Sequence, residues 1–378
     1  MLTTNGQRGE KTLEKKITGW FAVTAVAAAL SLASQTGAVA QDSAAVSAAR
    51  AFIQPYIDHP TAFPVTEPLQ TRPTGKRIAV VDCGSPICGL FADLAVEPAE
   101  LLGMKVTRFK SGTSADGVAA AFDAILASNV DGVFVPALAP SVWGRYLDEL
   151  AAAHVPVVAT GIIGLDPTKA QVAGAAEHTT TLSGQILANW TVANGKDGTN
   201  TVFYTTPELS FSQVLADSFV KTMKQICPAC SVRVVDIPVA SFGNNAPTIV
   251  VDDLLAHPET TTAAFAVGEQ AVGLVPALKT ASIKLKTALN SPDPSVLAQI
   301  QTGDFDMGMG VDLPVLTWTL VDSLARLTTG QEPAPSARAD EIVRQVLVAQ
   351  NLKGNLSQGW TGYPDFATRF KTLWANAK

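Results

Sequence analysis

The chain has 378 residues, more than one compact core usually contains, so we expect two lobes. Hydrophobic residues make up 47% of it and charged residues 16%, which indicates a well-filled globular protein and excludes a largely disordered one. The formal net charge of −6, without a basic run in the body of the chain, argues against a nucleic-acid partner.

The first forty residues have the features of a secretory signal. Lysines at 11, 15 and 16 precede an apolar stretch over residues 17–32, and Ala38-Val39-Ala40 follows it. This order predicts a signal peptide over residues 1–40, cleaved after about Ala40, and a secreted protein of the periplasm or cell envelope. The alternative is a permanent membrane anchor, but polar residues interrupt the stretch, and it is short for a span of about 20 apolar residues.

The four cysteines form two close pairs, Cys83 with Cys88 and Cys227 with Cys230. Export favours disulfides, and three connectivities exist, of which the local one needs only that each loop fold back on itself. A zinc site of four thiolates is the alternative, but the spacings do not resemble paired zinc knuckles. A redox role for the second pair is disfavoured because it closes a helix instead of opening one. We therefore predict structural disulfides and no metal.

A lead-in segment over residues 41–74 precedes the main fold. It begins with one short predicted helix, after which five prolines between residues 55 and 73 keep the chain extended. From residue 76, strands and helices alternate. The expected strands are 77–81, 105–109, 132–136 and 155–160, and the helices between them are 90–103, 114–128 and 143–154.

The same alternation is repeated in the second half of the chain. The expected helices are 178–195, 210–226, 246–258 and 269–281, and the expected strands are 201–206, 231–239, 262–267 and 283–289. Strands that are apolar on both faces and alternate with helices indicate a parallel, doubly wound sheet. Two such units predict two lobes, with a ligand cleft where the carboxyl ends of both sheets meet.

Four segments in this order are specific enough to suggest a family. They are GKRIAVVDCG, PVVATGIIG, FAVGEQAVGLVPAL and FDMGMGVDLPVLTWTLVDSLARLTTGQ. Over about residues 75–350 the chain resembles the type I periplasmic binding proteins, the ribose-binding-like solute receptors of bacterial ABC transporters. The lead-in VTEPLQTRPTGK is similar to an actinobacterial branch of that group.

The resemblance implies an α/β fold of two doubly wound parallel-sheet lobes joined by a three-crossing hinge, with the ligand cleft between them. The crossings are expected near residues 161–166, 311–314 and 330–335, where glycine and proline absorb hinge motion. The implied parts are an N-terminal lobe of residues 75–163 and 313–331, a C-terminal lobe of residues 164–312 and 332–350, and a C-terminal tail helix of residues 351–378.

The resemblance also implies which residues contact the ligand. The expected ligand-binding residues, with two aromatic side chains added, are Cys83, Gly84, Ser85, Trp143, Gly161, Phe211, Gln213, Glu269, Asn290 and Asp312. The alternative for Phe211 and Trp143 is a packing role. A disulfide between Cys83 and Cys88 would stiffen the first loop and lower the entropy lost on binding. The chain lacks two charged positions of the family's sugar receptors.

The implied function is that of an exported, monomeric solute-binding protein that is not an enzyme and has no cofactor. It would capture a sugar, a polyol or a small aromatic or apolar compound and deliver it to an ABC permease. One alternative is a ligand-sensing partner of a membrane receptor. Another is a secreted α/β hydrolase, which the lack of G-x-S-x-G and H-E-x-x-H motifs disfavours.

Overall fold

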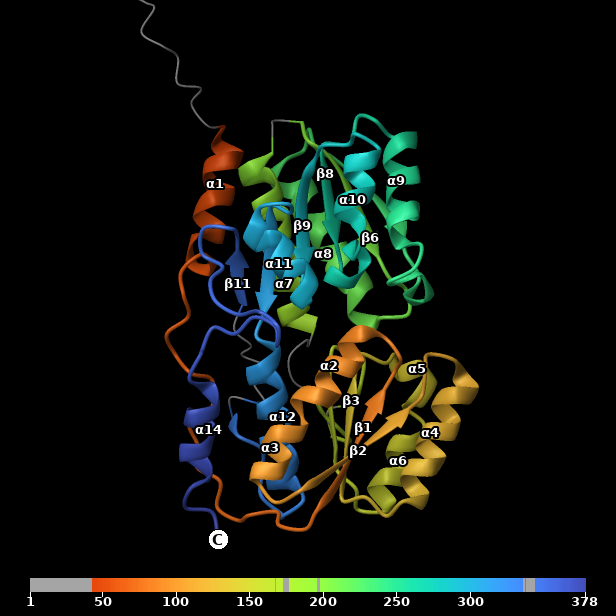
Figure 1. Ribbon diagram of the computed structural model, residues 1–378, viewed down its shortest axis with the longest axis vertical. Helices are drawn as coiled ribbons and strands as arrows, with labels where there is room; N and C mark the ends of the chain where they lie inside the picture. Colours follow the sequence, from red (N-terminus) through yellow and green to blue (C-terminus); the bar gives the residue numbers. More distant parts are fainter. Residues whose placement is uncertain (1–42, 167, 173–176, 196–197, 336, 338–343) are drawn as a thin grey trace, which may run out of the picture. The chain divides into compact units, whose positions relative to one another are not determined.

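In a computed structural model of the chain, the described residues are 43–378 except 167, 173–176, 196–197, 336 and 338–343 (Figure 1). The predicted signal peptide therefore lies outside them. They form two α/β lobes, each built on one sheet. Within these ranges, no helix is long and apolar enough to cross a membrane.

The first lobe contains a five-stranded parallel sheet in the order β2-β1-β3-β4-β5. Its strands are β1 (Arg77–Asp82), β2 (Lys105–Lys110), β3 (Gly132–Pro136), β4 (Val157–Thr160) and β5 (Gln171–Val172). Its helices are α2 (Pro86–Leu94), α3 (Val96–Leu101), α4 (Ala115–Ala127), α5 (Pro140–Trp143) and α6 (Tyr146–Ala152). The central strands β3 and β4 are buried throughout, which explains their continuous apolar sequence.

The second lobe contains a six-stranded sheet in the order β11-β10-β9-β8-β6-β7. Its strands are β6 (Asn200–Thr205), β7 (Ser231–Asp236), β8 (Thr262–Phe265), β9 (Lys286–Asn290), β10 (Met307–Val311) and β11 (Arg344–Leu347). Its helices are α7 (Glu177–Asn194), α8 (Ser210–Ile226), α9 (Ala246–Ala256), α10 (Leu274–Thr280) and α11 (Pro294–Thr302). The strands are parallel except β11, which runs antiparallel to β10.

The chain passes between the lobes after β5, after β10 and before β11. The helix that follows β10, α12 (Leu313–Leu327), packs on α2, α3 and β4 of the first lobe. From α12 the chain returns to β11 in the second sheet. The predicted positions near residues 311–314 and 330–335 lie on the connections after β10 and before β11. The predicted position near residues 161–166 precedes β5, which still pairs with β4 in the first sheet.

Two further segments connect the lobes. The N-terminal helix α1 (Ala44–Ile53) packs on α7 of the second lobe, whereas Leu69 lies in the core of the first. At the other end of the chain, Trp360 lies in the core of the second lobe, and α14 (Phe366–Trp374) packs in the first. Figure 1 shows both segments on the same side of the molecule. The lead-in and the tail are therefore additional interlobe connections.

These two segments contact each other where they pass between the lobes. The Tyr363 hydroxyl donates a hydrogen bond to the Ala62 carbonyl, and the Phe63 ring packs edge-on against Tyr363 at 5.2 Å between centroids. A Cβ added at Gly362 would lie 2.4 Å from Pro60 Cγ, so only glycine allows this approach. Gln345 Nε2 also donates to the Ile57 carbonyl at 2.9 Å.

A buried ion pair holds the lead-in and the tail to the first lobe. Arg326 Nε lies 2.7 Å from Asp322 Oδ2, and the two side chains are 6% and 0% exposed. Trp374 Nε1 donates to Asp322 Oδ1 at 2.8 Å. The Arg326 guanidinium also donates to the backbone carbonyls of Glu67 and Pro68. Asp322 and Arg326 thus link α12, α14 and the lead-in.

Candidate functional site

A pocket lies where carboxyl ends of strands from both sheets come together. Thr160 ends β4, Asn290 ends β9 and Val311 ends β10, and all three residues line it. The empty space in and at the mouth of the pocket, open solvent included, is about 720 Å³. We call this the interlobe pocket. Its position is the one that open parallel α/β sheets favour for ligands.

Apolar side chains from both lobes form most of the wall of the interlobe pocket. They are Ile87, Phe91, Ala137, Leu209, Phe211, Leu215, Val267, Val311, Leu313 and Leu316. Gly161 lines it as well. The polar lining residues are Thr160, Thr180, Ser183, Glu269, Asn290, Ser291, Asp293 and Arg344. The pocket therefore combines a large apolar surface with few polar groups, which is typical of small-molecule sites.

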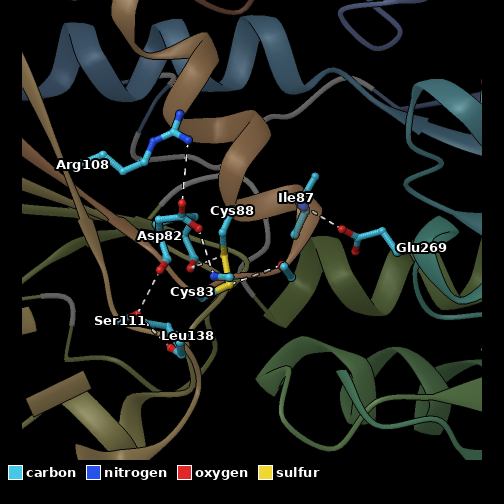
Figure 2. The surroundings of a disulfide bond; sticks show 12 residues. Asp82, Cys83, Ile87, Cys88, Arg108, Ser111, Leu138 and Glu269 are labelled. Carbon is cyan, nitrogen blue, oxygen red and sulfur yellow. Dashed lines mark hydrogen bonds and ion pairs between the residues drawn. A yellow bond between two sulfur atoms is a disulfide. The ribbon is translucent and has the colours of Figure 1, made fainter. Parts of the chain in front are cut away.

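Glu269 bridges the two lobes at the edge of this pocket. Its Oε1 accepts a hydrogen bond from the Ile87 backbone N–H at 2.6 Å (Figure 2). Ile87 is the second residue of α2, where backbone N–H groups have no acceptor inside the helix. The carboxylate therefore caps a helix of the opposite lobe, where it also interacts favourably with the helix dipole.

Burial dominates the electrostatics of Glu269. The side chain is 4% exposed, and this burial raises the pKa of its carboxyl group to about 7. The nearby Asp293 carboxylate acts in the same direction, whereas the hydrogen bond from Ile87 opposes the rise. Close packing brings Asp293 near, because a Cβ at Gly268 would lie 2.6 Å from Pro292 Cα. The loop after β9 can approach Glu269 this closely only because residue 268 is a glycine.

Both predicted local disulfides are present, which confirms the local connectivity. Cys83 is bonded to Cys88, and Cys227 is bonded to Cys230. Cys83 follows β1 and Cys88 lies in the first turn of α2, so the first bridge ties the strand to the helix. Both cysteines are buried. Figure 2 shows the bond between their sulfurs. The bridge closes the loop of residues 83–88, and the Ile87 N–H in this loop donates a hydrogen bond to Glu269 of the opposite lobe.

Three buried polar atoms of the pocket lining have no hydrogen-bond partner among the described residues. They are Thr180 Oγ1, Asn290 Oδ1 and Asp293 Oδ2. The Asn290 amide is fixed because its Nδ2 donates to the Ala266 carbonyl at 2.9 Å. Asp293 uses Oδ1 to cap α11 and leaves Oδ2 unpaired. Leaving such a group unpaired costs about 1–3 kcal/mol, so these atoms favour a bound solute.

The pocket lining also contains a basic side chain. Arg344 lies on β11 and donates through Nε to Ser183 Oγ at 2.8 Å. Ser183 in turn donates to the Thr179 carbonyl at 2.9 Å. Sequence reasoning missed Arg344 because it placed no strand at that position. The short apolar run Val346-Leu347-Val348, rich in β-branched residues, was the available signal for a strand.

The structure brings together four of the predicted ligand-binding residues. Gly161, Phe211, Glu269 and Asn290 line the interlobe pocket. Cys83, Gly84 and Ser85 do not line the pocket. They lie in the loop that the Cys83–Cys88 disulfide closes. Gln213 points along α8, where its Nε2 donates to Asp217 Oδ1 at 2.9 Å.

Trp143 lies in the core of the first lobe and outside the pocket lining. Its ring is fully buried and stacks on Phe122 with centroids 5.5 Å apart. Trp143 Nε1 donates to the Leu138 carbonyl at 3.1 Å. Its polar atom is therefore satisfied inside the lobe, which supports the packing role and not the ligand role.

Asp312 also lies outside the pocket lining. Both of its carboxylate oxygens accept hydrogen bonds from groups within the protein. Oδ1 accepts from Val315 N–H at 3.0 Å and caps α12. Oδ2 accepts from the Thr361 hydroxyl at 2.9 Å and from Gly362 N–H at 2.8 Å. Burial raises the pKa of the Asp312 carboxyl group to about 6. Asp312 thus anchors the tail at the crossing after β10.

Comparison with known proteins gives a family and a fold. A family model described as periplasmic binding protein domain matches residues 83–332. No curated protein sequence matches the chain. A galactofuranose binding protein is 14% identical, with a TM-score of 0.62 over 79% of this chain and 100% of that one.

Two other solved structures are similar at low sequence identity. A Caulobacter myo-inositol binding protein is 18% identical, with a TM-score of 0.64 over 75% of this chain and 97% of its own. A 5-methylthioribose transporter solute binding protein from Thermotoga lettingae is 15% identical, with a TM-score of 0.66 over 82% of this chain and 96% of its own. These similarities show a shared two-lobe fold. The family model matches well over half of this chain, and the chain therefore belongs to the periplasmic binding protein domain family.

Proposed function

We propose that this protein is the exported solute-binding component of an ABC transporter. It captures a small molecule in the interlobe pocket and delivers it to a permease in the membrane, without chemical change and without a cofactor. The observation that carries the proposal is the group of unpaired buried atoms on Thr180, Asn290 and Asp293, all in the pocket lining. Within the described part of the chain, four further buried atoms, on Thr191, Thr201, Thr262 and Gln299, are unpaired away from the pocket, but a solute would satisfy the three in the lining.

Other observations support a binding role. The pocket draws its lining from both lobes, so lobe closure would bury a solute from water. The described lining residues include neither histidine nor cysteine, so a nucleophile paired with a histidine base is not found there. The predicted signal peptide supports export. The sequence resembles the secreted members of this family that serve transporters.

Thermal unfolding in a panel of solutes tests the proposal. We expect at least one class among sugars, polyols, cyclic alcohols, amines and aromatic acids to stabilise the protein. A solute at about 100 times its dissociation constant stabilises the folded state by about 2.7 kcal/mol. The Phe211→Ala variant, which removes a lining ring, should show a smaller increase in unfolding temperature. A panel without any stabilising member, or equal stabilisation of the variant, would contradict the proposal.

A further inference from the structure

The chemistry of the interlobe pocket indicates the class of solute, if the proposed function holds. We propose that the solute has an apolar body and one head that donates more than one hydrogen bond, an ammonium group. It is therefore not a polyhydroxylated sugar. The apolar wall would bind the body, and Asn290 and Asp293 would accept hydrogen bonds from the head.

The apolar wall carries the first part of the argument. Phe91, Leu313 and Leu316 line the pocket from the first lobe, and Leu209, Phe211 and Leu215 line it from the second. A sugar bound against these surfaces would have hydroxyl groups without hydrogen-bond partners, which is costly in a buried site. An apolar body gains instead from the surface that it removes from water.

The unpaired atoms of Asn290 and Asp293 carry the second part. Asn290 is 6% exposed, and its amide nitrogen is already engaged by the Ala266 carbonyl, so only the acceptor Oδ1 remains. Asp293 Oδ1 is engaged by the backbone of Ser295 and Val296, so only Oδ2 remains. Both remaining atoms are acceptors, and each needs a donor on the solute.

The local charge supports a donor and disfavours an acidic head. The Glu269 and Asp293 carboxyl groups are close enough for Asp293 to affect the ionisation of Glu269. A carboxylate or phosphate at Asn290 would therefore add a third acidic group beside them. Arg344 is the basic residue in the lining, and it is hydrogen-bonded to Ser183 on α7. An acidic solute held by Arg344 is the competing arrangement, which the experiment must distinguish.

Four probes built on the same six-carbon ring test the proposal: cyclohexanol, cyclohexylamine, cyclohexanecarboxylate and myo-inositol. Binding is measured by ligand-observed NMR titration at pH 7.5, where the amine is protonated. We expect cyclohexylamine to bind at least ten-fold more tightly than the other three. Cyclohexanol has a single O–H, so it can donate to only one of Asn290 Oδ1 and Asp293 Oδ2.

The Asp293→Asn variant tests the head contact without removing the helix cap, because asparagine retains Oδ1 for α11. It replaces the unpaired acceptor with a donor and removes a charge, so cyclohexylamine, whose ammonium group has no acceptor, should bind at least ten-fold more weakly. Asp304→Asn is the matched control, since Asp304 pairs with Lys279 away from the pocket, and it should leave binding unchanged.

Three outcomes would overturn the proposal. They are binding of another of the four probes as tightly as cyclohexylamine, unchanged binding of cyclohexylamine to Asp293→Asn, or no binding of any of the four probes. In the first case solute capture in the pocket would stand and only the solute class would be wrong. The proposed function is tested separately by the thermal panel, and it fails if no solute stabilises the protein or if Phe211→Ala is stabilised to the same extent.

Discussion

Replacing Asp322 with alanine is expected to lower the free energy of unfolding by about 3–5 kcal/mol, the cost of removing one partner of a buried ion pair. Asp322 is fully buried and accepts hydrogen bonds from Arg326 Nε and Trp374 Nε1. Alanine would leave both donors without their acceptor in a site from which water is excluded. Urea unfolding, followed as a shift in midpoint at constant slope, measures the change.

Asp365→Ala provides the matched control for Asp322→Ala. Asp365 pairs with Arg369 four residues later, as Asp322 pairs with Arg326, but the two side chains are 59% and 41% exposed. Exposed pairs contribute about 0–1 kcal/mol, so this variant should unfold almost like the wild type. Similar losses in the two variants would show that the buried network does not hold α12, α14 and the lead-in together.

The second large effect is expected on the pH dependence of stability. Burial raises the pKa of Glu269 from its ordinary value of 4.5 to about 7. The folded protein therefore binds this proton more tightly than the unfolded chain does. The resulting stabilisation is complete below about pH 4.5 and is lost as the pH rises through about 7. From the size of the shift, the loss is about 3 kcal/mol.

Glu269→Gln should remove this contribution while its side-chain oxygen still accepts from Ile87 N–H. The measurement is urea unfolding of wild type and variant between pH 4.5 and 7.5. The difference between the two curves isolates Glu269, because Asp312, whose pKa is also raised, is present in both proteins. Glu259→Gln, at an exposed position, should retain the wild-type profile. Parallel curves for wild type and Glu269→Gln would contradict the buried interlobe carboxyl group.

The sequence predicts the parallel part of the fold well because that part is encoded locally. Strands β1, β3 and β4 are continuous apolar runs, and Ser114 caps α4 as its position suggests. The interlobe connections made by the lead-in and the tail were not predictable in this way. They depend on contacts between residues about 300 positions apart, such as Tyr363 with Ala62, and no periodicity records those contacts.

The candidate site was predictable where a polar residue ends a strand. Asn290 ends β9 and lines the pocket, and Glu269 opens the short helix after β8. The same reasoning selected Asp312, although an aspartate before a helix is equally suited to capping, which is its observed role. Trp143 was selected as an aromatic surface for the ligand, but Phe122 and the Leu138 carbonyl hold it in the core. Strand position alone does not distinguish these roles.

The distance between the two lobes, measured with and without solute, is the most direct test of capture by lobe closure. Spin labels at Ala127→Cys on α4 and Ala256→Cys on α9 are suitable, since both positions are exposed. The four native cysteines are held in disulfides and would not be labelled. With the most stabilising solute of the thermal panel at saturation, we expect double electron–electron resonance to show one narrow, shorter distance. The free protein should give a broader distribution that extends to longer distances. Identical distributions in the two samples would contradict lobe closure over a solute.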